Sequence, residues 1–229
     1  MRTRIAIVKR VIDIGMSLVG IIFLAPVMIT IAILIKLDSP GPIFYLSQRM
    51  GKNAKPFIMY KFRSMYVNSS TLRNPDGSMR VDKHDPRVTR IGRILRLGFD
   101  ELPQLFNVLK GNMSLIGPRP DPPEAFSHYR GEERRKLLVR PGITGLAQVT
   151  GRTDIPWQER LKYDLDYLNH PSLWLDCKIA FYTILEFIPP LRNRRFQRQA
   201  SLSGQMASRA VSTKIAFEDI GESLHNEAE

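Results

Sequence analysis

The segment IGMSLVGIIFLAPVMITIAILI, from Ile14 to Ile35, decides how the rest of the chain must be organised. Its 22 residues include no charged side chain. A helix rises about 1.5 Å per residue, so this run would reach about 33 Å, which matches the hydrocarbon core of a bilayer. The run is longer than the apolar core of a signal peptide, and no small-residue cleavage site follows it. The segment therefore predicts a membrane element that stays attached.

Positive charge flanks this run on both sides. Before it come Arg2, Arg4, Lys9 and Arg10, and after it come Lys36, Arg49, Lys52, Lys55, Lys61 and Arg63. Cytoplasmic flanks carry the excess of Lys and Arg, so both sides are predicted to be cytoplasmic. A break at Ala25-Pro26 is favoured because proline lacks an N–H and clashes with the preceding turn. Two half-helices that enter and leave by the same membrane face satisfy both observations, and a spanning signal anchor with a proline kink is the alternative.

Composition restricts the class of protein. The chain has 229 residues, and 34 Lys and Arg against 22 Asp and Glu give a formal charge of +12, which favours anionic partners. Hydrophobic residues make up 43% and charged residues 24%, which argues against global disorder and against a transporter with many spans. The single cysteine, Cys177, excludes an internal disulfide and favours a reducing setting.

The rest of the chain is predicted to be a cytoplasmic α/β domain, mostly helical with a small β-hairpin. The hairpin strands fall within 43–45 and 57–62, and Pro- and Gly-rich shaped loops are expected over 117–120 and 140–145. Helices are expected over 91–97, 100–109, 123–138, 157–168 and 173–188. These elements suggest a membrane hairpin over 1–38, a cytoplasmic domain over 39–190 and a basic-then-acidic tail over 191–229.

The chemistry-bearing candidate is the adjacent acid pair Asp100-Glu101, followed by Leu102-Pro103. One interpretation is structural, since an acid followed by proline is a common helix start. The other is chemical, because a carboxylate can attack phosphorus while its neighbour holds a magnesium ion. Arginines at candidate loops, namely Arg96, Arg119 and Arg152, could bind phosphate oxygens in pairs.

Many ordered motifs between Lys9 and Ile188 resemble one family, the monotopic phosphoglycosyl transferases, also called bacterial sugar transferases or undecaprenyl-phosphate sugar phosphotransferases. The motifs are KRVID at 9–13, SPGPIFY at 39–45, QRMG at 48–51, YKFRSM at 60–65, DPRVTRIG at 85–92, DELPQL at 100–105, NVLKG at 107–111, MSLIGPRP at 113–120 and RPGITGLAQVTGR at 140–152. The resemblance implies a monotopic membrane protein with an N-terminal re-entrant helix-break-helix hairpin.

The resemblance also implies an activity. Sugar-1-phosphate would pass from a nucleoside diphosphate sugar, with a UDP-sugar expected, to polyprenyl phosphate, giving UMP and a polyprenyl-diphosphate-sugar. Asp100 would form a covalent phosphosugar intermediate, and Glu101 together with Asp100 would hold Mg²⁺. Substrate phosphates would be bound by Arg119 and Arg152. Lys61 and Arg63, within the YKFRSM motif, and Arg96, which lies between two motifs, are further candidates. The setting would be the anionic cytoplasmic leaflet of a bacterial inner membrane, and a homodimer is compatible with the sequence.

Three positions depart from the family pattern. Ala25 stands before Pro26 where serine is usual, the spacing from Arg96 to Asp100 is one residue short, and Asn112 replaces an aspartate. Two other functions remain as alternatives, a membrane-tethered nucleic-acid binder and a non-catalytic scaffold. Nucleic acid is not an expected partner, because the sequence contains no basic stripe or recognition element.

Overall fold

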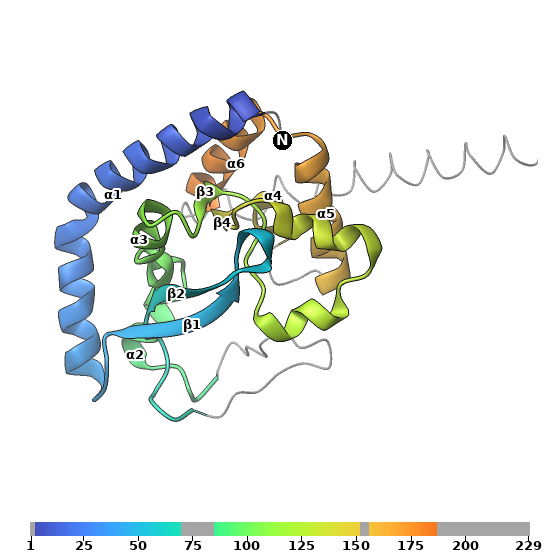
Figure 1. The fold of residues 1–229 in the computed structure, drawn as a ribbon. Helices are drawn as coiled ribbons and strands as arrows, with labels where there is room; N and C mark the ends of the chain where they lie inside the picture. The colour runs from blue at the N-terminus through green and yellow to red at the C-terminus, as the bar shows by residue number, and fades with distance from the viewer. Residues whose placement is uncertain (1–2, 70–84, 152–155, 187–229) are drawn as a thin grey trace, which may run out of the picture. The chain divides into compact units, whose positions relative to one another are not determined.

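The structure is a computed structural model, and it describes residues 3–69, 85–151 and 156–186 (Figure 1). Nearly all of these residues belong to one compact unit, Met1–Ile184. The α-helices are α1 (Thr3–Asp38), α2 (Arg90–Leu95), α3 (Gln104–Leu109), α4 (Leu146–Gly151), α5 (Trp157–Asn169) and α6 (Leu173–Glu186), and the strands are β1 (Phe44–Met50), β2 (Pro56–Phe62), β3 (Ser114–Ile116) and β4 (Gly142–Thr144). Short 3₁₀ helices are η1 (Lys52–Ala54), η2 (Phe99–Glu101), η3 (Pro123–His128) and η4 (Gly131–Leu138). The prediction of a mostly helical chain with a small sheet is confirmed.

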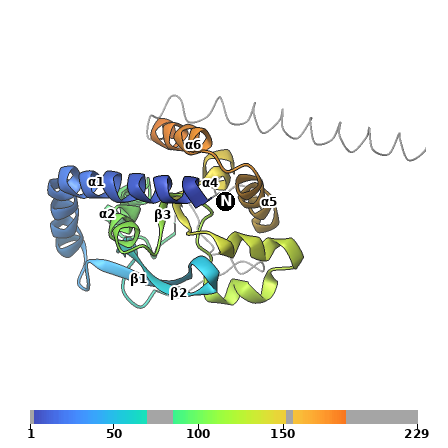
Figure 2. The same ribbon diagram turned by 45° about the horizontal axis from the view of Figure 1, so that its top comes forward.

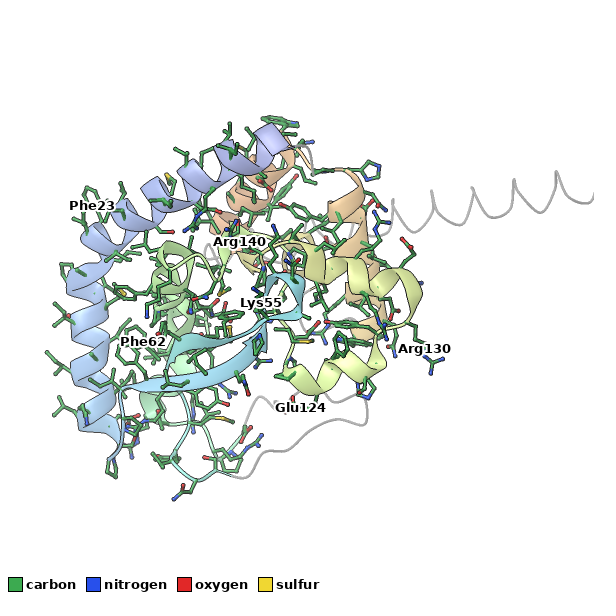
Figure 3. The ribbon with its side chains drawn as sticks, in the orientation of Figure 1. Phe23, Lys55, Phe62, Glu124, Arg130 and Arg140 are labelled. Atoms are coloured by element: carbon green, nitrogen blue, oxygen red, sulfur yellow. The ribbon has the colours of Figure 1, made fainter. Side chains whose placement is uncertain are left out.

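The long helix α1 contains the whole apolar run and is bent near its middle (Figures 1 and 2). Phe23 lies at the bend (Figure 3). Pro26 supplies the cause, because its ring removes one backbone hydrogen bond from the helix ladder. The helix is continuous through Ala25-Pro26 and bends there, so the two arms belong to one helix. Thr30 Oγ1 donates to the Pro26 carbonyl oxygen at 2.9 Å.

The arm of α1 that follows the bend packs through an apolar stripe. Met28, Ile31 and Ile35 are buried at helical spacing, and they form one core with Phe62 of β2 and Leu95 of α2. A side chain every three or four residues faces the same side of a helix, so one stripe is buried while the opposite side stays free. This arm is therefore part of the domain's core.

The arm that precedes the bend packs through polar side chains instead. Asp13 is 3% exposed, and its Oδ1 accepts hydrogen bonds from Leu115 N at 2.9 Å and Ser114 Oγ at 3.1 Å. One turn earlier, Arg10 donates to carbonyl oxygens at the end of α3, with Val108 O at 2.7 Å. Arg10 thus adds a charged donor to the carbonyl oxygens at the end of α3, among which Val108 O also accepts from Gly111 N at 2.9 Å. Both arms of α1 therefore pack on the same unit.

The outward side of α1 is apolar and exposed along both arms. Its exposed large apolar side chains are Ile7, Val8, Val11, Ile12, Ile14, Met16, Leu18, Val19, Ile22, Phe23, Val27, Ile29, Ile33, Leu34 and Leu37. Among the described residues, α1 alone is long and apolar enough to cross a membrane by length and composition. A helix in the core of a soluble protein would bury these side chains, so their exposure favours contact with lipid.

The predicted hairpin is confirmed. β1 and β2 pair antiparallel from Phe44 opposite Phe62 to Met50 opposite Pro56, with η1 between them. The β2 strand has a second partner that the sequence did not predict. The Asn107 side chain of α3 accepts from Tyr60 N at 2.9 Å and donates to Ile58 O at 2.7 Å. Asn107 thus occupies the free edge of β2 much as a neighbouring strand would.

Other expectations from sequence need correction. The helix predicted over 100–109 is divided by Leu102-Pro103 into η2 and α3, and the helix predicted over 123–138 is two 3₁₀ helices, η3 and η4. The 140–145 loop contains β4, which pairs parallel with β3. This pairing is very close, since a β-carbon on Gly142 would collide with the backbone of Gly117. The helices predicted over 157–168 and 173–188 correspond to α5 and α6 as far as the chain is described. The tail over 191–229 lies outside the described residues.

Candidate active site

The acid pair lies in a tight turn that packs against the apolar core formed with α1. Gly98 precedes it with a φ of +125°, a conformation that favours glycine and reverses the chain after α2. Phe99 and Leu102, on either side of the pair, pack against the core that contains Met28, Ile31 and Ile35. The backbone around the acids is thus fixed by the bent helix itself.

No side-chain capping hydrogen bond is made at the start of η2 or of α3. The residue that precedes α3 is Pro103, whose side chain cannot accept a hydrogen bond. Asp100 and Glu101 lie instead in η2, and their side chains are 15% and 19% exposed. Two adjacent carboxylates that are largely withdrawn from water repel each other, so they require nearby positive charge.

Two cations from distant parts of the chain supply that charge. Lys61, near the end of β2, places Nζ 2.6 Å from Glu101 Oε1 and 3.8 Å from Asp100 Oδ2. Arg119, in the loop after β3, places Nη2 3.0 Å from the same Glu101 oxygen. Glu101 therefore accepts from both cations, whereas among the described residues no hydrogen bond is made to the Asp100 carboxylate.

The surroundings of the two acids shift their pKa values in opposite directions. Burial raises the pKa of Asp100 above its ordinary value, and the charge of Lys61 only partly opposes this effect. Burial acts on Glu101 in the same direction, but the charges and hydrogen bonds of Arg119 and Lys61 outweigh it and hold the pKa of Glu101 well below its usual range. Pairs of acids whose pKa values are driven apart are typical of sites where the two groups have different roles.

The loop that carries Arg119 is held by backbone pairing. Gly117 N donates to Thr144 O, and Gly142 N donates to Pro118 O, both at 2.9 Å. Arg119 itself lies between Pro118 and Pro120, whose rings restrict the backbone. Its side chain is 41% exposed, so it can meet a ligand from solvent while it contacts Glu101.

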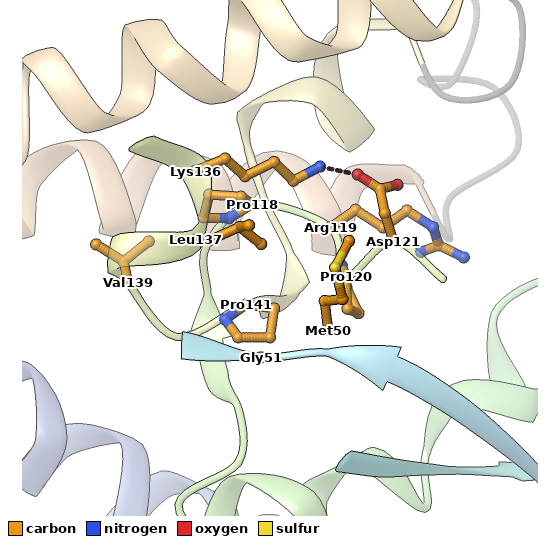
Figure 4. Close-up of a pocket in the computed structure, with 10 residues that line it drawn as sticks. All are labelled: Met50, Gly51, Pro118, Arg119, Pro120, Asp121, Lys136, Leu137, Val139 and Pro141. Carbon is orange, nitrogen blue, oxygen red and sulfur yellow. Dashed lines mark hydrogen bonds and ion pairs between the residues drawn. The ribbon is translucent and has the colours of Figure 1, made fainter. Parts of the chain in front are cut away.

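A pocket adjoins this loop (Figure 4). It is lined by Met50, Gly51, Pro118, Arg119, Pro120, Asp121, Lys136, Leu137, Val139 and Pro141. Met50 N donates to Asp121 O at 2.9 Å, which ties the loop to the end of β1. Asp121 and Lys136 were not among the residues predicted from sequence, and the close-up shows their side chains joined beside Arg119 (Figure 4).

The other predicted phosphate-binding residues are placed differently. Arg63 is 5% exposed and donates to Ser39 O at 2.7 Å, Pro40 O at 2.8 Å and Ile35 O at 3.3 Å, so it joins β2 to the end of α1 and is not brought to the acid pair. Arg96 directly follows α2, where its charge interacts with those of Asp85 and Asp100. Arg152 lies outside the described residues.

Asp100 and Glu101 are the residues of this site whose side chains could hold a magnesium ion. No group of three or more His, Cys, Asp or Glu residues within the described ranges could hold a metal ion. Mg²⁺, however, is commonly bound by one or two carboxylates, with water and substrate phosphates completing its shell. Asp100 and Glu101 offer that number of carboxylates side by side, which suits an ion whose remaining ligands come from a diphosphate.

Known proteins resemble the chain over the same region. The model of the bacterial sugar transferase family matches residues 4–189. An undecaprenyl-phosphate glucose phosphotransferase from Komagataeibacter xylinus is 45% identical over 77% of this chain and 35% of its own length. The UDP-N-acetylgalactosamine-undecaprenyl-phosphate N-acetylgalactosaminephosphotransferase of Aeromonas hydrophila is 44% identical over 78% of this chain and 43% of its own length.

A third relative is the UDP-glucose:undecaprenyl-phosphate glucose-1-phosphate transferase of Escherichia coli, 39% identical over 79% of this chain and 40% of its own length. The chain thus spans about two fifths of the length of these curated relatives. The matched region contains α1 except its first residue, the acid pair, both of its cations and the loop over 117–122 that adjoins the pocket, called the pocket loop. On this evidence the chain belongs to the bacterial sugar transferase family.

Proposed function

We propose that this chain transfers sugar-1-phosphate from a nucleoside diphosphate sugar to polyprenyl phosphate. The observation that carries the proposal is the asymmetric acid pair: Glu101 is neutralised by Lys61 and Arg119, while Asp100 beside it accepts no hydrogen bond from the described residues. A carboxylate oxygen with no hydrogen-bond donor on it keeps its lone pairs available for attack. The names of the relatives support undecaprenyl phosphate as acceptor and a UDP-sugar as donor.

The first step is attack by an Asp100 oxygen on the phosphorus that carries the sugar. A bond forms between that oxygen and phosphorus, and the bond from phosphorus to the bridging oxygen of the diphosphate breaks. The nucleoside monophosphate leaves with the electron pair, and no proton needs to move. Arg119 and Lys61 bring positive charge to the phosphate oxygens, which favours such in-line displacement.

The second step returns Asp100 to its starting state. A phosphate oxygen of polyprenyl phosphate attacks the same phosphorus, the bond to Asp100 breaks, and polyprenyl-diphosphate-sugar is formed. Mg²⁺ bound by Asp100 and Glu101 would supply neutralisation of diphosphate charge. Glu101 and its two cations keep their arrangement through both steps, since neither step changes their protonation.

The assay that tests this function uses purified full-length protein with Mg²⁺, polyprenyl phosphate and a panel of UDP-sugars. Release of UMP with at least one donor, dependent on polyprenyl phosphate for repeated turnover, is expected. The panel should include UDP-glucose and UDP-N-acetylgalactosamine, because the relatives differ in the sugar that their names specify. No release with any donor would overturn the proposal. A nucleic-acid binder or scaffold would give that result.

The bent helix supports a membrane arrangement in which α1 enters and leaves by the cytoplasmic face. Both arms pack on one unit, through Asp13 in the first arm and Ile35 in the second, and a straight span would separate them by the thickness of a bilayer. Lys9 and Lys36 mark the two flanks as positive. The exposed apolar side of α1 would face the acyl chains, and this arrangement would bring a lipid phosphate to the acid pair.

Cysteine labelling in intact cells tests this topology. In a chain with Cys177→Ser, single cysteines would replace Ala6 and Pro42, which are both exposed and lie near the two ends of α1. A thiol reagent that does not cross the inner membrane is expected to label neither position until the cells are lysed. Labelling of one position alone before lysis would indicate a spanning helix.

A further inference from the structure

A chain of buried charges lies beyond Arg119 and has no part in the two steps above. Lys136 of η4 is 6% exposed, and its Nζ lies 2.6 Å from Asp121 Oδ2 and 2.8 Å from Asp164 Oδ2. Tyr129, 2% exposed, donates its hydroxyl to the same Asp121 oxygen at 2.5 Å. Three segments, the pocket loop, η4 and α5, thus meet at one ammonium group.

A buried cluster of charges adds little to the stability of a fold. Removing charges from water costs several kcal/mol per ion, and apolar side chains of similar size often stabilise a core as well or better. Arg160 adds a further charge that acts on both Asp121 and Asp164. The position of the cluster suggests what it does, because Asp121 follows Arg119 with only Pro120 between them (Figure 4).

Asp121 is a potential competitor for Arg119. Its charge acts on Arg119 in the same direction as the charges of Glu101 and Asp100. Burial raises the pKa of Asp121, but the charge of Lys136 and the hydrogen bonds from Lys136 and Tyr129 outweigh it, so the pKa stays below its ordinary value and Asp121 remains an anion. An anion without other partners two residues from a partly exposed guanidinium would attract it.

We infer that Lys136 is a positioning residue for the phosphoryl transfer: it neutralises Asp121, with help from Tyr129, and so leaves Arg119 directed at Glu101 and the donor diphosphate. This inference rests on the proposed function of Arg119 as a phosphate-binding group. Without Lys136, Asp121 keeps only the Tyr129 hydroxyl and the charge of Arg160, so it attracts Arg119, and a bound diphosphate must compete with that carboxylate.

The test is a rescue experiment on the full chain. Lys136→Met keeps the length of the side chain and removes its charge, and it is expected to raise the KM for the sugar nucleotide about tenfold, with a smaller effect on kcat. The double variant Lys136→Met with Asp121→Asn is expected to return the KM to within about twofold of the wild type, because the competing anion is gone. Arg135→Met, an exposed cation on the same 3₁₀ helix, is the matched control and should leave the KM unchanged.

If Lys136→Met does not fold, a less disruptive substitution tests the same inference. Tyr129→Phe removes only the hydroxyl that binds Asp121 and keeps the ring that stacks on Trp157. It should raise the KM about twofold to threefold, and Asp121→Asn should again cancel the rise. A KM that is unchanged in the single variants, or that stays raised in the double variants, would overturn the inference. If the wild-type enzyme turns over and a single variant has a raised KM that Asp121→Asn does not restore, Lys136 is rejected as a positioning residue and the proposed function stands. If the wild-type enzyme does not turn over, the proposed function itself is rejected.

Discussion

Replacement of Asp100 by asparagine is expected to lower UMP release by about three orders of magnitude or more, because an amide oxygen cannot form the acyl-phosphate. Asparagine has the same shape as aspartate, and no hydrogen bond from the described residues is lost at this carboxylate. The fold should therefore persist, and the loss should appear in kcat. Turnover is measured with the donor that works best for the wild type.

The control for this variant is Asp166→Asn. Asp166 is an exposed carboxylate on α5 that contacts His170. It undergoes the same chemical change outside the site, so it should keep wild-type turnover. Thermal unfolding of both variants checks that they are folded. Undiminished turnover by a folded Asp100→Asn enzyme would eliminate Asp100 as the nucleophile and move attention to Glu101 or to direct transfer between the two substrates.

The second large effect is expected for Glu101→Gln. This change removes the charge that both Lys61 and Arg119 contact, so the two cations are left to pair with Asp100 and blunt its attack. A loss of about two orders of magnitude in kcat is expected, comparable with removal of one strong electrostatic contact in an active site. Glutamine keeps an acceptor oxygen, so the position of Lys61 is disturbed less than by alanine.

Magnesium dependence separates the roles of the two acids. If Glu101 helps to hold the ion, the Mg²⁺ concentration for half-maximal turnover should rise in Glu101→Gln, and a chelator should abolish turnover of the wild type. Lys61→Met is the comparison, since it removes a charge near the same carboxylate but no metal ligand. A Glu101→Gln enzyme with wild-type kcat and an unchanged Mg²⁺ requirement would contradict the proposed role.

The sequence predicted the hairpin and the acid pair because both have local signals. Aromatic residues together with Ile43 and Ile58 mark the two strands of the hairpin, and a family motif marks Asp100. The helix predicted over 100–109 is too long because Pro103 suggests part of a helix start, whereas it separates η2 from α3. The helix predicted over 123–138 is two 3₁₀ helices, and 3₁₀ turns share the composition of α-helices. β3 and β4 have three residues each, too few for a periodic pattern to be recognised.

The partners of the acid pair could not be read from local patterns. Lys61 and Arg63 are two residues apart and would share a face of a strand, but β2 ends at Phe62, and Arg63 N bonds to Ile43 O while its side chain reaches the end of α1. Lys136 follows two arginines in a run that suggests a solvated surface, and only the packing of η4 on α5 buries it.

For α1, too, the local feature was predictable from the sequence and the tertiary contacts were not. Pro26 indicated where the helix would deviate, since its effect on the backbone is local. Which side of the helix would pack on the domain was hidden, because an apolar run presents similar residues on every side. The buried stripe through Met28, Ile31 and Ile35, and the polar contacts of Asp13, depend on the tertiary arrangement.

The most direct measurement of the central claim is the mass of the protein after incubation with donor and Mg²⁺ but without polyprenyl phosphate. The chain is expected to gain the mass of one sugar-phosphate, peptide mapping should place it on Asp100, and polyprenyl phosphate should remove it. Asp100→Asn should gain nothing. Turnover of the donor with no adduct on the wild-type protein, or an adduct on any other residue, would contradict covalent catalysis by Asp100.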